Sequence, residues 1–206
     1  MDFTRPLATV TPTLDGSVLA ALARADSNFT TGQLHRLLRD HSEEGIRRVL
    51  RRLVQQGIVT SERVGNAFAY RFNREHLAAD HVLGLVHLFE DFLSRLGGLL
   101  GEWSIPPVYA AVFGSVAKRT MTDTSDIDLF VVRPDAVAEE IWASQVAGCV
   151  ERVARWTGND LRPLEFTEAE LRARSAGEPV LRDVVAHGLT VAGQRTWLTR
   201  QLTRKG

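Results

Sequence analysis

The stretch FGSVAKRTMTDTSDIDLFVV, residues 113–132, decides the fold of the rear half of this chain. Apolar runs at its two ends predict two strands, which are joined by a tight Gly114-Ser115 turn and a helix. Because side chains alternate across a strand, Asp126 and Asp128 are expected to project from the same face. Two carboxylates held side by side near a glycine turn predict a site for Mg²⁺ and a triphosphate.

The pattern around this stretch alternates between apolar runs and amphipathic segments, which predicts an α/β unit with a mixed sheet. Strands are expected at 108–113, 127–132 and 160–166, and helices follow at 136–156, 167–175 and 178–187. Pro163 removes a backbone donor, so the last strand is expected to be an edge strand or irregular.

The same stretch resembles the nucleotidyltransferases of the DNA polymerase β superfamily in their minimal form. Their signature is Gly-Ser, a spacer and Asp-x-Asp, and Gly114, Ser115, Asp126 and Asp128 fill all four positions. The resemblance covers roughly residues 107–192. It implies Mg²⁺-dependent transfer of a nucleoside monophosphate from an NTP to a hydroxyl, with release of pyrophosphate.

The resemblance also implies a two-metal site with three carboxylates, which serve as catalytic groups and metal ligands. Asp126 and Asp128 would supply two of them. Glu165 is the expected third, and Asp160 is the alternative. The commonest pattern of the family has Asp at the third position, so Glu165 departs from it.

The turn residues are expected to bind the nucleotide. Gly114 lets the backbone approach the phosphates, because it has no Cβ. Ser115 is expected to offer its hydroxyl and amide to a phosphate oxygen. Lys118 and Arg119 are expected to reach the same phosphates, although ordinary surface positions would explain these two residues equally well.

The front half has the order of a winged helix-turn-helix. Helical apolar stripes precede residue 56, and Thr30 with Gln33 has capping-box spacing. A hairpin is expected at the Gly65-Asn66 turn. Residues 14–73 resemble winged-helix transcriptional regulators of the MarR and ArsR type, whose third helix enters the DNA major groove.

That resemblance implies nucleic-acid contacts from the basic third helix and the wing. The expected contact residues are Arg47, Arg48, Arg51, Arg52, Arg63 and Arg71. Two other interpretations stay open. The arginines of the third helix would be only solvated if Glu43 and Glu44 paired with them, and winged helices also serve as protein-contact modules.

The chain is therefore expected to be an α+β protein with three parts. These are a winged-helix domain at 1–74, a linker helix at 75–106 and a nucleotidyltransferase domain at 107–206. Residues 1–74 carry 11 Arg and 7 acidic residues, whereas residues 75–206 carry 14 basic and 18 acidic residues. A basic front half and an acidic rear half suggest different partners.

Composition excludes two classes of protein. Cys149 is the only cysteine, which excludes an internal disulfide framework and a Cys-based zinc cluster. The most apolar window, 82–100, is interrupted by His87, Glu90, Asp91 and Arg95, which make it unsuitable for spanning a bilayer. We therefore expect a cytoplasmic protein without membrane contact, and its amphipathic linker helix is suited to a homodimer.

Three functions remain open at this stage. The leading one is an NTP-dependent transferase that acts on a nucleic acid, such as tRNA, or on a protein. The second is a DNA-binding regulator whose rear domain senses nucleotides. The third is an antitoxin-type modifier whose acceptor is a partner toxin.

Overall fold

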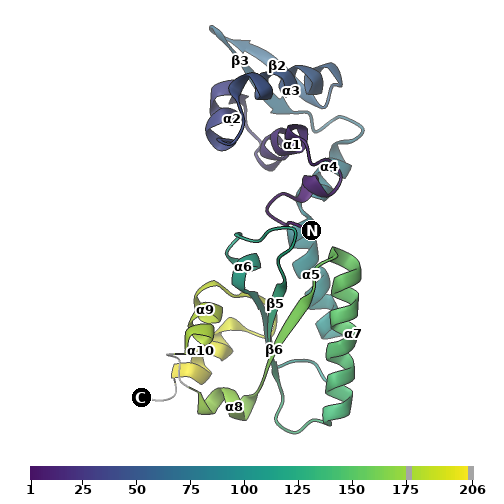
Figure 1. The fold of residues 1–206 in the computed structure, drawn as a ribbon, viewed down its shortest axis with the longest axis vertical. Coiled ribbons are helices and arrows are strands. Elements are labelled where there is room, and N and C mark those ends of the chain that lie inside the picture. Colours follow the sequence, from purple (N-terminus) through teal and green to yellow (C-terminus); the bar gives the residue numbers. More distant parts are fainter. Residues whose placement is uncertain (175–177, 204–206) are drawn as a thin grey trace. The chain divides into compact units, whose positions relative to one another are not determined.

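The computed structural model describes residues 1–174 and 178–203, and the chain divides into two compact units (Figure 1). The first unit is Arg5–Phe89, and the second is Met1–Thr4 together with Glu90–Gly206. Each unit has its own hydrophobic core. Among the described residues, no helix is long and apolar enough to cross a bilayer.

The first unit contains short helices and a small antiparallel sheet. Its elements are η1 (Pro6–Thr9), α1 (Leu14–Arg24), β1 (Phe29–Thr30), α2 (Thr31–Leu37), α3 (Glu43–Gln55), β2 (Val59–Val64), β3 (Ala67–Phe72) and α4 (Ala79–Val86). The three strands lie in the order β1-β3-β2. Three helices followed by a hairpin confirm the predicted winged-helix order.

Local sequence signals explain where these helices begin. The Thr30 side chain accepts from the Gln33 amide and the Gln33 side chain accepts from the Thr30 amide, which is the predicted capping box. Ser42 accepts from the Gly45 amide in the same way at the start of α3. The hairpin turns at Gly65, whose φ of 60° suits glycine.

The predicted linker helix is divided into two helices. α4 ends at Val86, and α5 (Leu88–Gly101) begins two residues later, so the segment expected to be one linker helix at 75–106 contains two helices. α4 packs against α1, and Ala79 and Val86 are buried in the core of the first unit. Phe92, Leu96 and Leu100 of α5 are buried and belong to the second unit.

The second unit is built on a four-stranded sheet. Besides α5, its elements are β4 (Tyr109–Phe113), α6 (Gly114–Ala117), β5 (Ile127–Arg133), α7 (Glu139–Thr157), β6 (Leu161–Thr167), α8 (Glu168–Ala173), α9 (Pro179–His187), β7 (Leu189–Ala192) and α10 (Arg195–Thr203). β7 and α10 were not predicted from the sequence. Ser175, the expected end of the helix at 167–175, lies outside the described residues.

The strand order in this sheet is β6-β5-β4-β7. β4 pairs antiparallel with both β5 and β7, whereas β5 pairs parallel with β6, so the sheet is mixed as predicted. β6 lies at an edge, which is where a strand interior tolerates Pro163.

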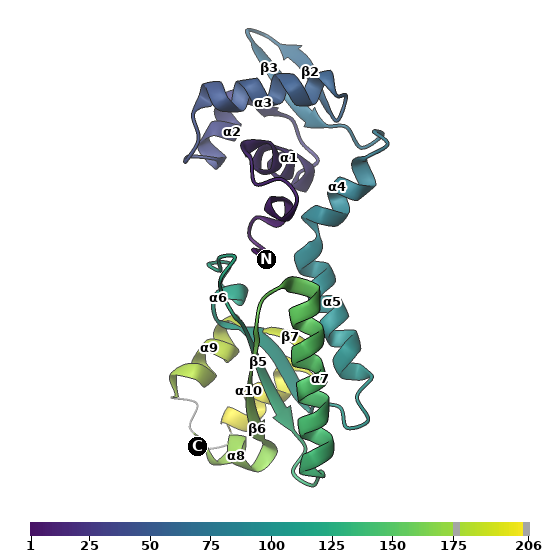
Figure 2. The same ribbon diagram turned by 45° about the vertical axis from the view of Figure 1, so that its right-hand side comes forward.

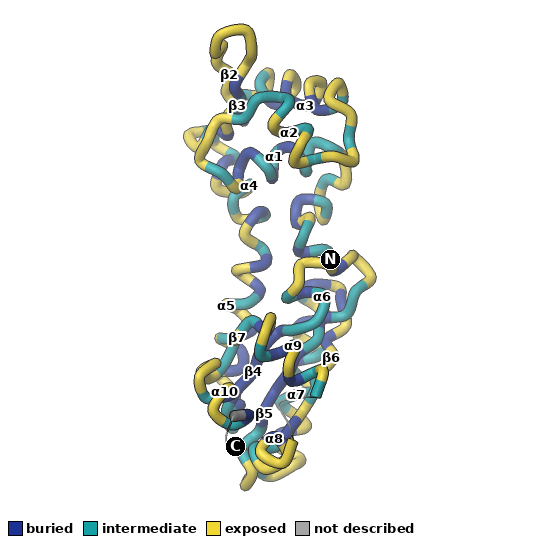
Figure 3. Tube along the Cα trace, turned by 90° about the vertical axis from the view of Figure 1, so that its left-hand side faces the viewer, coloured by how far each residue is buried: buried dark blue, intermediate teal, exposed yellow. Residues whose placement is uncertain are grey.

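Helices cover both faces of the sheet (Figure 2). On one face, side chains of α8, α9 and α10 form a core with alternate residues of the strands, among them Phe130 and Phe166. On the other face α7 packs along β6, and its Trp142 is buried. The central strands are accordingly the most buried part of this unit, whereas the β2–β3 turn of the first unit is exposed (Figure 3).

Candidate active site

The predicted acidic pair lies at the beginning of β5. Asp128 is the second residue of the strand and pairs with Phe113 at the end of β4, which brings it beside the Gly114-Ser115 turn. Asp126 comes directly before the strand. Because side chains alternate, Asp126 and Asp128 project from the same face of the sheet, and their charges interact.

Gly114 is the point at which the turn and the acidic pair meet. Its φ of 67° lies in the left-handed region, which L side chains rarely adopt. A Cβ at this position would overlap the carboxylate of Asp128. The glycine is therefore required for the backbone conformation and for the space that Asp128 occupies.

Burial raises the pKa of the Asp128 carboxyl above its ordinary value, and the negative charge of Asp126 raises it further. The guanidinium of Arg162 acts in the opposite direction. Nη2 of Arg162 lies 2.7 Å from Oδ2 of Asp126. The pair is thus a carboxylate cluster that is only partly neutralised by one arginine.

The two cations expected at the phosphates have acidic neighbours. Nζ of Lys118 lies 2.7 Å from Oδ1 of Asp183 on α9. Arg119 has a φ of 55°, and its Nη2 lies 4.0 Å from Oε1 of Glu90. Ser115 is the second residue of α6, next to Gly114. The structure brings Gly114, Ser115 and Lys118 to the same end of the sheet as the acidic pair.

Asn159 holds the loop that leads into the pair, and the sequence analysis did not identify it. Its side chain is 4% exposed. Nδ2 donates to the carbonyl of Ser125 at 2.9 Å and to that of Asp123 at 3.3 Å. A buried amide that satisfies two loop carbonyls fixes the loop beside Asp126. Its position after the left-handed helix cap at Gly158 was the only sequence signal.

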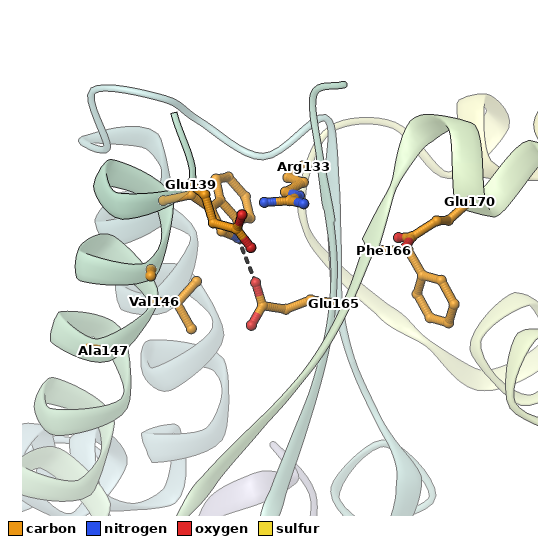
Figure 4. A pocket seen from close by; sticks show the side chains of 9 residues that line it. Arg133, Glu139, Val146, Ala147, Glu165, Phe166 and Glu170 are labelled. Carbon is orange, nitrogen blue, oxygen red and sulfur yellow. Dashed lines mark hydrogen bonds between the residues drawn. The ribbon is translucent and has the colours of Figure 1, made fainter. Parts of the chain in front are cut away.

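Glu165 does not join the acidic pair. In the parallel register of β5 and β6, Arg162 is the partner of Asp128, and Glu165 is the partner of Val131. Glu165 therefore projects from the opposite face of the sheet, towards α7, while Phe166 points the other way (Figure 4). Its Oε2 accepts from Nε1 of Trp142 at 2.5 Å, in a cavity of about 450 Å³.

Asp126 and Asp128 form a site with two carboxylates, which suits one divalent ion, and not the expected site with three carboxylates. Two carboxylates on one strand face offer the oxygen ligands that Mg²⁺ prefers. Within residues 1–174 and 178–203, no three Asp, Glu, His or Cys side chains lie together so as to hold a metal ion. Asp160, the alternative third ligand, directly precedes β6, and its carbonyl accepts from the Ile127 amide.

The six arginines expected to contact nucleic acid fall into different environments. Arg52 donates to Asp15 on α1 at 2.9 Å, and Arg71 pairs with Asp26. Arg47 pairs with Glu43 and Glu44, which is the local pairing that the sequence analysis left open. Nε of Arg63 donates to the carbonyl of Gly65 within the hairpin. Arg48 and Arg51 are exposed on α3.

A groove of about 770 Å³ lies between α2, α3 and the hairpin of the first unit. Its lining includes Arg47, Arg51, Phe68 and Tyr70. Phe68 is 54% exposed, so its ring is accessible at the edge of the groove.

Each of the two units contains a segment that matches a known protein family. Residues 96–178 match the nucleotidyltransferase domain family, and residues 13–91 match the penicillinase repressor family. The first match agrees with the motif of residues 113–132. The second match confirms the predicted N-terminal winged-helix domain and assigns it to the penicillinase repressors among winged-helix regulators.

The chain also resembles some solved structures. One is a toxin–antitoxin complex with AMP-PNP, with 19% identity, 54% of this chain and 82% of that chain covered, and a TM-score of 0.40. Another is a tri-AMPylated Shewanella oneidensis HEPN toxin in complex with MNT antitoxin, with 18% identity, 57% and 81% coverage, and a TM-score of 0.35. Likenesses this weak assign no function by themselves. No curated protein sequence matches the chain.

The two domains are therefore identified by the family matches and by the geometry of residues 113–132. Both agree with the predicted fusion of a winged-helix domain and a nucleotidyltransferase domain. The chain therefore contains a nucleotidyltransferase domain, matched over residues 96–178, and an N-terminal winged-helix domain, whose residues 13–91 match the penicillinase repressor family.

Proposed function

We propose that this chain transfers a nucleoside monophosphate from an NTP to a hydroxyl group of a nucleic acid, in a reaction that requires Mg²⁺. The observation that carries this proposal is the arrangement of Asp126 and Asp128 on one face beside the Gly114 turn. Two adjacent carboxylates at the start of an otherwise apolar strand repel each other unless a cation lies between them.

The reaction forms a bond between the acceptor oxygen and the α-phosphorus and breaks the bond from that phosphorus to the bridging oxygen of pyrophosphate. Asp126 and Asp128 would hold the ion that neutralises the triphosphate when it is bound. Gly114 allows the backbone to approach the phosphates. The hydroxyl proton passes to solvent or to a carboxylate of the pair.

A nucleic acid is favoured as the acceptor by the surface of the first unit. Its groove combines two arginines, Arg47 and Arg51, with the aromatic side chains of Phe68 and Tyr70. Arginines neutralise phosphates and aromatic rings stack on unpaired bases, so this combination suits a nucleic-acid strand. The match of residues 13–91 to the penicillinase repressor family supports the same class of partner.

The proposal is tested by incubating the protein with labelled NTPs, Mg²⁺ and a panel of acceptors that includes tRNA, single-stranded DNA and candidate partner proteins. Label on a nucleic acid is expected from the wild type and not from the double variant Asp126→Asn, Asp128→Asn. The matched control is Glu140→Gln, Glu151→Gln, which removes two exposed carboxylates of α7 from the same domain.

Other outcomes would replace the proposal with another function. Label on a protein would make the chain an antitoxin-type modifier. Mg²⁺-dependent nucleotide binding without product, for every acceptor tried, would indicate a nucleotide-sensing regulator. Equal transfer by the double variant would show that the acidic pair has no part in the chemistry.

A further inference from the structure

The structure places an arginine where the sequence suggested a third carboxylate. In the parallel pairing of β5 and β6, the residue beside Asp128 is Arg162. Paired residues of adjacent strands project from the same face, so the guanidinium of Arg162 lies on the side of the acidic pair. Its Nη2 is 2.7 Å from Oδ2 of Asp126.

The other charged side chains near Asp126 and Asp128 are engaged elsewhere. Glu165 lies on the opposite face, where Trp142 holds it. Lys118, one of the predicted phosphate-binding cations, pairs with Asp183, an acid whose charge also acts on Asp128. Within the described part of the chain, no third acid completes a metal-binding group with Asp126 and Asp128.

The Arg162–Asp126 ion pair is suited to exchange. The Arg162 side chain is 68% exposed and that of Asp126 is 29% exposed. An ion pair this open to solvent contributes little to stability, because water screens it and the side chains lose entropy in forming it. The guanidinium can therefore leave Asp126 for a phosphate, which its planar fork of donors binds in bidentate geometry.

We propose that Arg162 takes the place of a second divalent ion, so that the nucleotide binds with one Mg²⁺ on Asp126 and Asp128 and with the Arg162 guanidinium on its phosphates. A second cation next to this guanidinium would meet like-charge repulsion at short range. The proposal deepens the proposed function and depends on it. It makes Arg162 a substrate-binding residue that also sets the metal stoichiometry.

The test counts bound Mn²⁺ by electron paramagnetic resonance, with a saturating ATP analogue whose α,β-bridging oxygen is replaced by methylene. We expect one Mn²⁺ per nucleotide-bound wild-type chain. Arg162→Ala should still bind one Mn²⁺, and its affinity for the analogue should fall about tenfold or more because a charge-assisted contact is lost. Arg162→Asp should bind two.

The matched control is Arg155→Ala, an exposed arginine of α7, which packs on the opposite face of the sheet. It should leave both the metal count and the nucleotide affinity unchanged. Thermal unfolding of each variant checks that it is folded. If Arg162→Asp does not fold, Arg162→Ala still tests the proposal through nucleotide affinity.

Two Mn²⁺ ions in the wild type would overturn this inference and leave the proposed function intact. Unchanged nucleotide affinity in Arg162→Ala would also overturn it. A wild type that binds neither Mn²⁺ nor the analogue would overturn the proposed function and the inference together.

Discussion

The carboxylate of Asp128 occupies the space beside Gly114 that a Cβ at position 114 would enter. Strand pairing causes this contact, because Phe113 at the end of β4 is the register partner of Asp128. The phosphate-side turn and the acidic pair are therefore one structural unit. A change in either residue is expected to alter the position of the other.

Gly114→Ala should disrupt this unit. An alanine at a φ of 67° costs about 1–2 kcal/mol of backbone strain, and its Cβ would also displace Asp128. We expect a lower midpoint of unfolding and loss of Mg²⁺-dependent nucleotide binding, measured by denaturation and calorimetry. The control is Gly148→Ala in α7, where a Cβ meets nothing within 4 Å. It should keep nucleotide binding and gain about 0.5–1 kcal/mol of stability. Normal binding by Gly114→Ala would contradict the coupling.

Asp128→Asn should stabilise the metal-free protein at neutral pH. The pKa of Asp128 is raised by burial and by Asp126, so between pH 3.8 and that raised value the folded state binds more protons than the unfolded state. The free energy of unfolding of the wild type therefore falls as pH rises through this interval. Asp128→Asn has no carboxyl to ionise at this position, so its stability does not fall for this reason. We expect its Tm in a chelator to exceed that of the wild type at pH 7, with the difference vanishing near pH 3. A lower Tm at pH 7 would refute this account.

Asn159→Ala should loosen the loop before Asp126. The variant removes the two hydrogen bonds that Nδ2 donates to the carbonyls of Asp123 and Ser125, which contribute about 0.5–1.5 kcal/mol each. Urea unfolding should show this loss, and hydrogen exchange should become faster in residues 118–126. Ser144→Ala, at an exposed position of α7, is the control and should change neither measurement. Unchanged exchange in the Asn159 variant would mean that other contacts hold the loop.

Two arginines of α3 should differ in their effect on nucleic-acid binding. Arg51 is exposed and lines the groove, so Arg51→Ala should weaken binding and lower the salt dependence by about one counterion. Arg52 donates to Asp15, so Arg52→Ala should mainly affect stability and leave the salt slope unchanged. Fluorescence anisotropy at several salt concentrations measures both. A steeper loss of binding from Arg52→Ala would place the contact surface elsewhere on α3.

Cys149 should react slowly with thiol reagents in the folded protein. The side chain is 2% exposed, and burial raises the pKa of its thiol to about 11. Because the folded pKa exceeds the ordinary value of 9.0, the folded state holds the proton longer, and stability falls as pH rises from 9.0 towards 11. Cys149→Ala should show a smaller loss over this interval in urea unfolding. Rapid labelling of the native protein would contradict the burial of this thiol.

Much of the fold follows from local signals in the sequence. Thr30 with Gln33 and Thr167 with Glu170 form the predicted capping boxes, because such contacts involve residues only three positions apart. The same holds for the acidic pair, since two-residue spacing on a strand fixes a common face for Asp126 and Asp128 whatever surrounds them. β7 and α10 were not predicted because their apolar patterns are short. β7 is stabilised by its pairing with β4, and α10 by its packing in the core that includes β4.

The motif of Gly114, Asp126 and Asp128 can be recognised from the amino-acid sequence, and it indicates the type of chemistry. The neighbours of that motif follow only from the packing of the strands and helices. Residues 161–166 show no clear alternation of apolar and polar side chains, so the sequence does not say which face Glu165 takes. The register of β6 against β5 settles this, because Arg162 and Glu165 are an odd number of residues apart and must project from opposite faces. The hydrogen bond from Arg52 to Asp15, which lie 37 residues apart in the chain, likewise depends on the packing between helices and not on local spacing.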